Sequence, residues 1–133
     1  MTGGLSMELS MLFWAVILTF VQVLVAVQLC IMQSGLPEVA GNREGFTPKG
    51  MAGRAKRAHA NMLENLVLFA ALVLVVQVGG LNNDLTALGA QIFVIARLVY
   101  AVIYLIGVPW LRTILWAVSA VGMAMMAWPI LAG

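Results

Sequence analysis

Four long apolar stretches constrain this chain more than any motif does, because each of them is long enough to cross a membrane. A hydrocarbon core of about 30 Å requires about 20 helical residues. The stretches run from Met11 to Met32, Ala58 to Val78, Leu85 to Ile106 and Val108 to Leu131. Hydrophobic residues make up 63% of the 133 and charged residues only 9%, which is too little polar surface for a soluble globule. The sequence therefore predicts an integral membrane protein.

The connections between these stretches predict the topology. The second and third connections, Gly79 to Asp84 and Gly107 to Pro109, are short, so consecutive helices must lie antiparallel. We expect an all-α, up-and-down bundle of four transmembrane helices in a single domain, 1–133. The helices are expected at about 9–33, 56–78, 85–106 and 109–131, with a loop rich in Gly and Pro at 34–55.

The distribution of charge predicts an orientation. The second connection carries only Asp84, and Glu8 is the only charge before the first helix. The positive-inside rule therefore places the loops 34–55 and 107–112 in the cytoplasm and both termini on the opposite side. This assignment rests on the bases of the first and third connections: Arg43, Lys49, Arg54, Lys56, Arg57 and Arg112. The net charge of +2 gives no indication of a nucleic-acid partner.

Polar residues form one stripe on the second helix and a matching one on the third. Arg57, Asn61 and Glu64 fall within about 60° of one another on a helix. The same spacing rule groups Arg97, Tyr100 and Tyr104, which follow one another at i, i+3 and i+7. Each stripe runs from the cytoplasmic end toward the middle of its helix.

Glu64 and Arg97 lie at about the same depth, 12 to 13 Å from the cytoplasmic helix ends, so the two charges are expected to pair. One interpretation is a structural ion pair that sets the helix register. The other is a polar pocket open to the cytoplasm, which better explains the additional Arg57, Asn61 and Arg112. Such a pocket is rich in cations and donors, so it suits an anionic ligand or a thiolate, whose pKa falls beside Arg.

The segments RAKRAHANMLEN, ARLVYAVIY and PWLRT resemble those of the MAPEG family, the membrane-associated proteins in eicosanoid and glutathione metabolism. The chain is most similar to a bacterial-type member of that family. The resemblance covers the chain from about Glu8 to its end. It implies a homotrimer that binds glutathione as a co-substrate between neighbouring subunits near the cytoplasmic side. The residues implied in binding glutathione are Arg57, Asn61, Glu64, Arg97, Tyr100, Tyr104 and Thr113.

The resemblance also implies an activity. Arg112 matches the arginine that lies beside the thiol in catalytic members, and Thr113 stands where some members have a serine. The implied reaction is that of a glutathione transferase or peroxidase, with a lipophilic electrophile or hydroperoxide arriving from the bilayer. Ala60 and Trp116 depart from residues used by some members, so a non-catalytic trimeric scaffold or regulator remains an alternative, as does a small multidrug transporter.

The remaining polar residues are interpreted as structural. Cys30 has no second cysteine to pair with and is expected to pack inside the first helix. His59 lies about 160° from the stripe of the second helix, so we expect it at headgroup level and predict no metal site. The compact chain is compatible with a bacterial inner membrane.

Overall fold

The computed structural model describes residues 3–133, which form a bundle of long helices. Its helices are α1 (Met7–Ser34), α2 (Leu36–Ala40), α3 (Gly50–Val78), α4 (Asp84–Ile106) and α5 (Pro109–Ala132), and the described residues contain no strand. All except the short α2 are long and apolar enough to span a membrane. The predicted all-α, four-helix membrane fold is thus confirmed.

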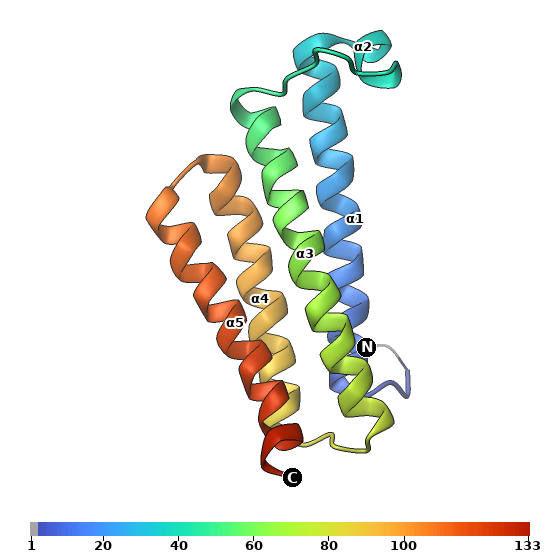
Figure 1. Cartoon of the computed structure of the whole chain (residues 1–133), viewed down its shortest axis with the longest axis vertical. Coiled ribbons are helices and arrows are strands. Elements are labelled where there is room, and N and C mark those ends of the chain that lie inside the picture. The colour runs from blue at the N-terminus through green and yellow to red at the C-terminus, as the bar shows by residue number, and fades with distance from the viewer. Residues whose placement is uncertain (1–2) are drawn as a thin grey trace.

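The four long helices run alternately up and down (Figure 1). We call the end that carries α2 and the α4–α5 connection the loop end, and the end that carries both termini the terminal end. At the loop end, α1 and α3 extend beyond α4 and α5 (Figure 1). This follows from their lengths of 28 and 29 residues, against 23 and 24 for α4 and α5.

The first connection differs from the expected loop at 34–55. It contains the short helix α2, which begins with Pro37 in its first turn, and α3 starts at Gly50. Gly50 has a φ of +56°, a conformation that favours glycine, and Gly53 lies against Pro48. A Cβ atom at Gly53 would lie 2.9 Å from the carbonyl oxygen of Pro48. In the sequence these glycines indicated a break in the helix. In the structure they allow α3 to start at Gly50, with Gly53 packed against the Pro48 backbone.

Local hydrogen bonds define where α4 begins and ends. The Asn83 side chain accepts from the Thr86 backbone N–H at 3.0 Å, and the Asn83 N–H donates to Thr86 Oγ1 at 2.9 Å. This reciprocal capping box satisfies two donors that a helix start leaves unpaired. At the other end Gly107 adopts a left-handed conformation with a φ of +91°, which terminates α4.

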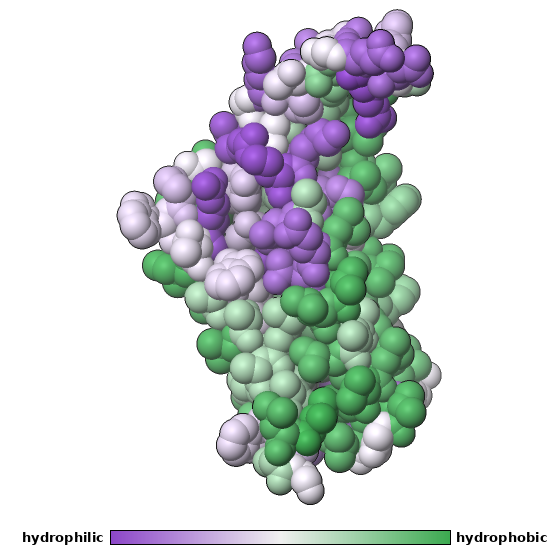
Figure 2. All heavy atoms as spheres, in the orientation of Figure 1, coloured by the Kyte–Doolittle hydropathy of each residue, from purple (hydrophilic) through white to green (hydrophobic). Residues whose placement is uncertain are grey.

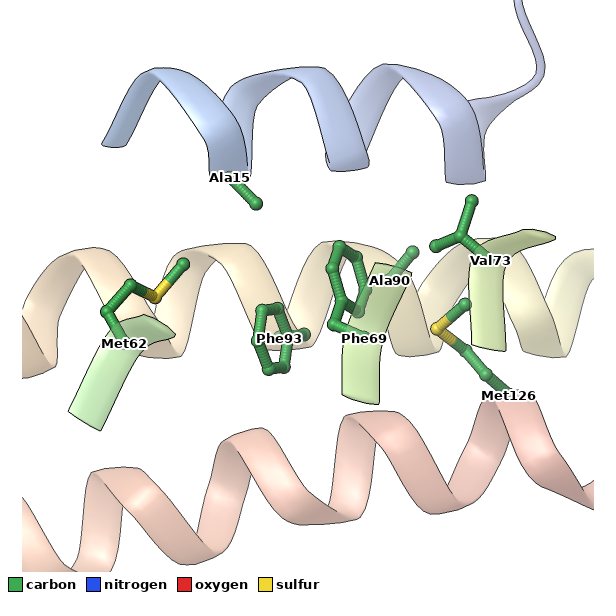
Figure 3. Close-up of a cluster of buried hydrophobic side chains, with 7 residues drawn as sticks. All are labelled: Ala15, Met62, Phe69, Val73, Ala90, Phe93 and Met126. Atoms are coloured by element: carbon green, nitrogen blue, oxygen red, sulfur yellow. The ribbon is translucent and has the colours of Figure 1, made fainter. Parts of the chain in front are cut away.

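Apolar side chains from all four long helices fill the terminal half of the bundle. The rings of Phe69 and Phe93 stack at 4.0 Å between centroids, with 7° between their planes (Figure 3). Gly89 of α4 lies against Gly122 of α5, where a Cβ atom on either glycine would approach the other's carbonyl oxygen to 2.6 Å or less. The remaining members of this core are Ala15, Met62, Val73, Ala90 and Met126.

A buried polar contact joins α1 to α4 at the terminal end. Thr86 Oγ1 donates to Glu8 Oε1, and Glu8 is only 2% exposed. Nearby, Ser6 Oγ donates to Gln77 Oε1 at 2.7 Å, which ties the start of α1 to α3. These buried polar groups have protein partners, so this end needs no ligand to satisfy them.

Candidate functional site

The polar residues of α3 and α4 lie in the loop half of the bundle. Figure 2 shows hydrophilic residues gathered at the loop end and continuing over α3 toward the middle of the molecule, whereas the terminal half of this face is mostly hydrophobic. For a chain that spans a membrane, polar side chains at that depth mark a site.

Arg97 is the centre of this site. It is 1% exposed, and its Nη2 donates to Asn61 Oδ1 at 2.6 Å, which joins α4 to α3. Its Nε and Nη1 atoms are buried and have no hydrogen-bond partner among residues 3–133. The site therefore contains a buried cation with donors that the protein itself leaves unused.

Asn65 holds Asn61 in position for this contact. Its Nδ2 donates to the Asn61 carbonyl oxygen at 2.8 Å and lies 3.3 Å from Asn61 Oδ1. Asn65 was not among the site residues expected from the sequence. The sequence feature that could have indicated Asn65 is its i, i+4 spacing from Asn61, which brings the two side-chain amides to one face of α3.

A series of cation and ring contacts continues from Arg97 toward the loop end. Arg97 Cζ lies 4.1 Å from the centroid of the Tyr100 ring, and the Tyr100 and Tyr104 rings are 5.5 Å apart. Arg112 Cζ, from α5, lies 4.6 Å from the Tyr104 centroid. Both tyrosines are buried against Ala58 of α3. Two arginines and two tyrosines from α4 and α5 thus form one continuous cluster.

The expected ion pair between Glu64 and Arg97 is absent, so that prediction was wrong. Arg97 bonds to the neutral Asn61, while Glu64 is exposed and has no hydrogen bond or ion pair within the described residues. The reason is rotational: Asn61 and Asn65 face α4, and Glu64 is turned about 60° to 100° away from them. The exposed carboxylate of Glu64 thus lies on the turn of α3 that follows Asn61, the residue that bonds the buried guanidinium of Arg97.

Three of the residues expected in the site lie at its margin. Arg57 is exposed and its Nη1 lies back along α3, 3.2 Å from where a Gly53 Cβ would be. Thr113 is exposed and its hydroxyl donates to the Pro109 carbonyl oxygen at 3.2 Å, so it is bonded within α5. Arg112 is half-buried through its contact with Tyr104.

The arrangement suits an organic anion. The arginine donors can bind carboxylates, the exposed Glu64 can accept from an ammonium group, and Arg112 presents a positive charge beside an aromatic ring. In the described part of the chain, no three His, Cys, Asp or Glu residues are grouped as metal ligands.

Comparison with known proteins identifies one family. The family model of MAPEG matches residues 11–132, which is nearly the whole chain and includes every residue of the candidate site. No curated protein and no solved structure matches the chain.

Proposed function

We propose, from the premise that this chain belongs to the MAPEG family of glutathione-related membrane proteins, that it binds glutathione in the site around Arg97. We further propose that it is a glutathione transferase or peroxidase for lipophilic electrophiles or hydroperoxides. The site opens to the cytoplasm in this proposal, and a homotrimer completes it.

The buried Arg97 carries the proposal. A buried donor without a partner costs about 1 to 3 kcal/mol, and more when the group is charged. Arg97 has two such nitrogens, and its only hydrogen bond within the described residues is to Asn61. An anionic ligand would remove this cost by pairing with Nε and Nη1, and its binding requires that the side chains covering these two atoms move aside.

Glutathione matches the chemistry of the site. It carries two carboxylates, one ammonium group, two amides and a thiol. In our proposal Arg97 and Arg57 bind the carboxylates, Glu64 accepts from the ammonium group, and Asn61 with the tyrosine hydroxyls bonds the peptide backbone. This assignment explains why Glu64 is left without a partner inside the protein.

Arg112 is the residue that we propose for catalysis. Its positive charge favours a thiolate over a thiol, so the thiol proton passes to water and the sulfur becomes nucleophilic. With an electrophile, a sulfur–carbon bond forms as the leaving group departs with its electron pair. With a hydroperoxide, the thiolate attacks the terminal oxygen, the O–O bond breaks and the alcohol leaves. The thiol of a second glutathione then attacks the resulting sulfenic acid, which releases water and gives the disulfide. Thr113, whose hydroxyl donates to Pro109, keeps its oxygen lone pairs free to accept a hydrogen bond from glutathione.

Calorimetric titration of glutathione into the detergent-purified protein, with ultraviolet absorbance of the thiolate followed in parallel, tests this function. We expect saturable binding and a thiolate signal in the wild type. The signal should disappear in Arg112→Leu with a much smaller loss of affinity, whereas Lys49→Leu, which removes an exposed cation outside the site, should retain both. Failure of the wild type to bind glutathione would refute the proposal.

A non-catalytic glutathione-binding scaffold is the second candidate. It is favoured by Thr113, whose hydroxyl is bonded to Pro109 and supplies no donor to the cluster of arginines and tyrosines. A scaffold predicts saturable binding without a thiolate signal. It also predicts that Arg112→Leu changes neither observation.

A further inference from the structure

A second cationic cavity lies on the other side of α3, at the loop end. It has a volume of about 230 Å³ and is enclosed by α1, α3 and the first connection. Its floor is apolar and comes from Val23, Ala26 and Val27 of α1. Its charged residues are Arg43 from the connection and Lys56 from α3, and the imidazole of His59 from α3 lines it beside them. We call this space the α1–α3 cavity.

The α1–α3 cavity is distinct from the glutathione site proposed above. On α3, Lys56 and His59 face about 140° to 160° away from Asn61, which bonds Arg97. The two sets of residues therefore lie on opposite faces of the same helix. No residue that lines the cavity contacts Arg97, Tyr100, Tyr104 or Arg112 through any interaction described above.

The charge of the cavity favours an anion. Three basic side chains line it and no acidic side chain does, although Glu38 and Glu44 belong to the same connection. Like charges gathered without a counter-ion repel one another, so a bound anion would stabilise the group. Neither of these two glutamates lines the cavity, so its positive charge is not neutralised by a lining carboxylate.

Arg43 is held in a specific conformation at the cavity. Its φ of +61° is the only positive value for a non-glycine among the described residues. Its Nε donates to the Val39 carbonyl oxygen at 2.6 Å, and this bond leaves the two Nη atoms available. Backbone conformations of this kind persist where the surrounding structure imposes them, often at binding sites.

The depth of the cavity identifies the source of the anion. The 28 residues of α1 span about 42 Å, which exceeds a hydrocarbon core of about 30 Å, so the loop end reaches the headgroup region. Val23 and Val27 lie about 10 to 17 Å before the end of α1, at the depth of acyl chains. The cavity thus has cations near the headgroups and an apolar wall below them.

We propose that the α1–α3 cavity binds an anionic membrane phospholipid, with its phosphate between Arg43, Lys56 and His59 and an acyl chain along Val23 and Val27. Basic pockets between transmembrane helices on the cytoplasmic side bind such headgroups in other proteins. A free phosphate would use the cations but would leave the apolar wall uncovered. This proposal does not depend on glutathione binding.

The test uses the full chain in nanodiscs of phosphatidylcholine, with or without phosphatidylglycerol. We expect phosphatidylglycerol to raise the thermal unfolding midpoint and to remain bound to the wild type in native mass spectrometry. In Lys56→Gln the retained phosphatidylglycerol should fall about fivefold, the equivalent of about 1 kcal/mol for one cation near the membrane surface. Lys56→Arg should retain it, and so should Lys49→Gln, which removes an exposed cation outside the cavity.

Three results would overturn the proposal. Equal losses in Lys56→Gln and Lys49→Gln would indicate non-specific attraction to the headgroups. An equal midpoint shift with inorganic phosphate in phosphatidylcholine nanodiscs would identify a free anion as the ligand. A loss of glutathione affinity in Lys56→Gln would assign these cations to the glutathione site. Circular dichroism of each variant establishes that it is folded.

Discussion

The two halves of the bundle treat buried polar groups in opposite ways. In the terminal half, the buried Glu8 has Thr86 as its partner, and stacked rings and a glycine contact fill the space between helices. In the loop half, Arg97 keeps two buried nitrogens unpaired, and the α1–α3 cavity lies nearby. A further cavity of about 210 Å³ separates α1 from α4 there, and Gln22 Oε1 is buried beside it without a partner among the described residues.

This difference shows that the described residues complete their own hydrogen bonds in the terminal half and do not in the loop half. A chain that only needed to cross the membrane could build both halves like the terminal one, where apolar packing and paired polar groups fill the space between helices. Unpaired buried polar atoms reduce stability, and those found among the described residues, Arg97 Nε and Nη1 and Gln22 Oε1, all lie in the loop half.

The largest expected effect is at the α4–α5 contact of the terminal half. Gly122→Leu places a side chain where even a Cβ atom would lie 2.6 Å from the Gly89 carbonyl oxygen. We expect the free energy of unfolding to fall by about 3 kcal/mol or more, measured by circular dichroism in mixed micelles. Ala124→Leu, at an exposed position of α5, should change it by less than about 0.5 kcal/mol. Equal stability of both variants would contradict the close contact.

A smaller effect is expected at Arg97, and it should separate stability from binding. In Arg97→Met, Asn61 still has Asn65 as a partner, so the free energy of unfolding without ligand should change by less than about 1 kcal/mol or rise. Glutathione affinity should fall at least about tenfold, because charged hydrogen bonds contribute about 1.5 to 3 kcal/mol each.

Thr86→Val is the corresponding change in the terminal half. It leaves the buried Glu8 without that partner and also removes the acceptor for the Asn83 N–H in the capping box of α4. It should lower the free energy of unfolding by about 1 to 3 kcal/mol and leave glutathione affinity unchanged. If Arg97→Met destabilises the protein as much as Thr86→Val does, Arg97 is structural and the contrast between the halves is lost.

The smallest expected effect is the coupling between the stacked rings. A double-mutant cycle with Phe69→Leu and Phe93→Leu should give a coupling of about 0.5 to 1.5 kcal/mol in the free energy of unfolding. Phe69→Leu combined with Phe20→Leu, an exposed residue of α1, should be additive. Additivity in both cycles would mean that the stack adds nothing to apolar burial.

Much of the fold was predictable, because the length and apolar composition of a stretch are enough to identify a transmembrane helix. The ends of α4 were close to their expected positions, since Asn83, Thr86 and Gly107 act locally. The start of α3 was not predicted, because Gly50 and Gly53 usually indicate a break and here permit contact with Pro48. Glycine content alone does not distinguish the two uses.

The candidate site was predictable as a set of residues but not as a set of contacts. Helical spacing brought Arg97, Tyr100 and Tyr104 to one face, and the structure joins them to Arg112 through ring contacts. The same spacing suggested Glu64 as the partner of Arg97, and the partner is Asn61. Asn61 and Glu64 differ by only about 60° around the axis of α3. The rotation of α3 relative to α4 therefore decides which of them bonds Arg97, and the sequence periodicity does not give that rotation.

The sequence by itself determined that the chain crosses the membrane four times, in alternating directions, with its polar residues near one end. These properties depend on apolar run length and helical period, which are local. Only the tertiary structure decided which polar atoms found partners and which remained unpaired, and where cavities persisted. Those outcomes depend on the rotation and separation of whole helices, because a hydrogen bond forms only when two particular atoms come within about 3 Å.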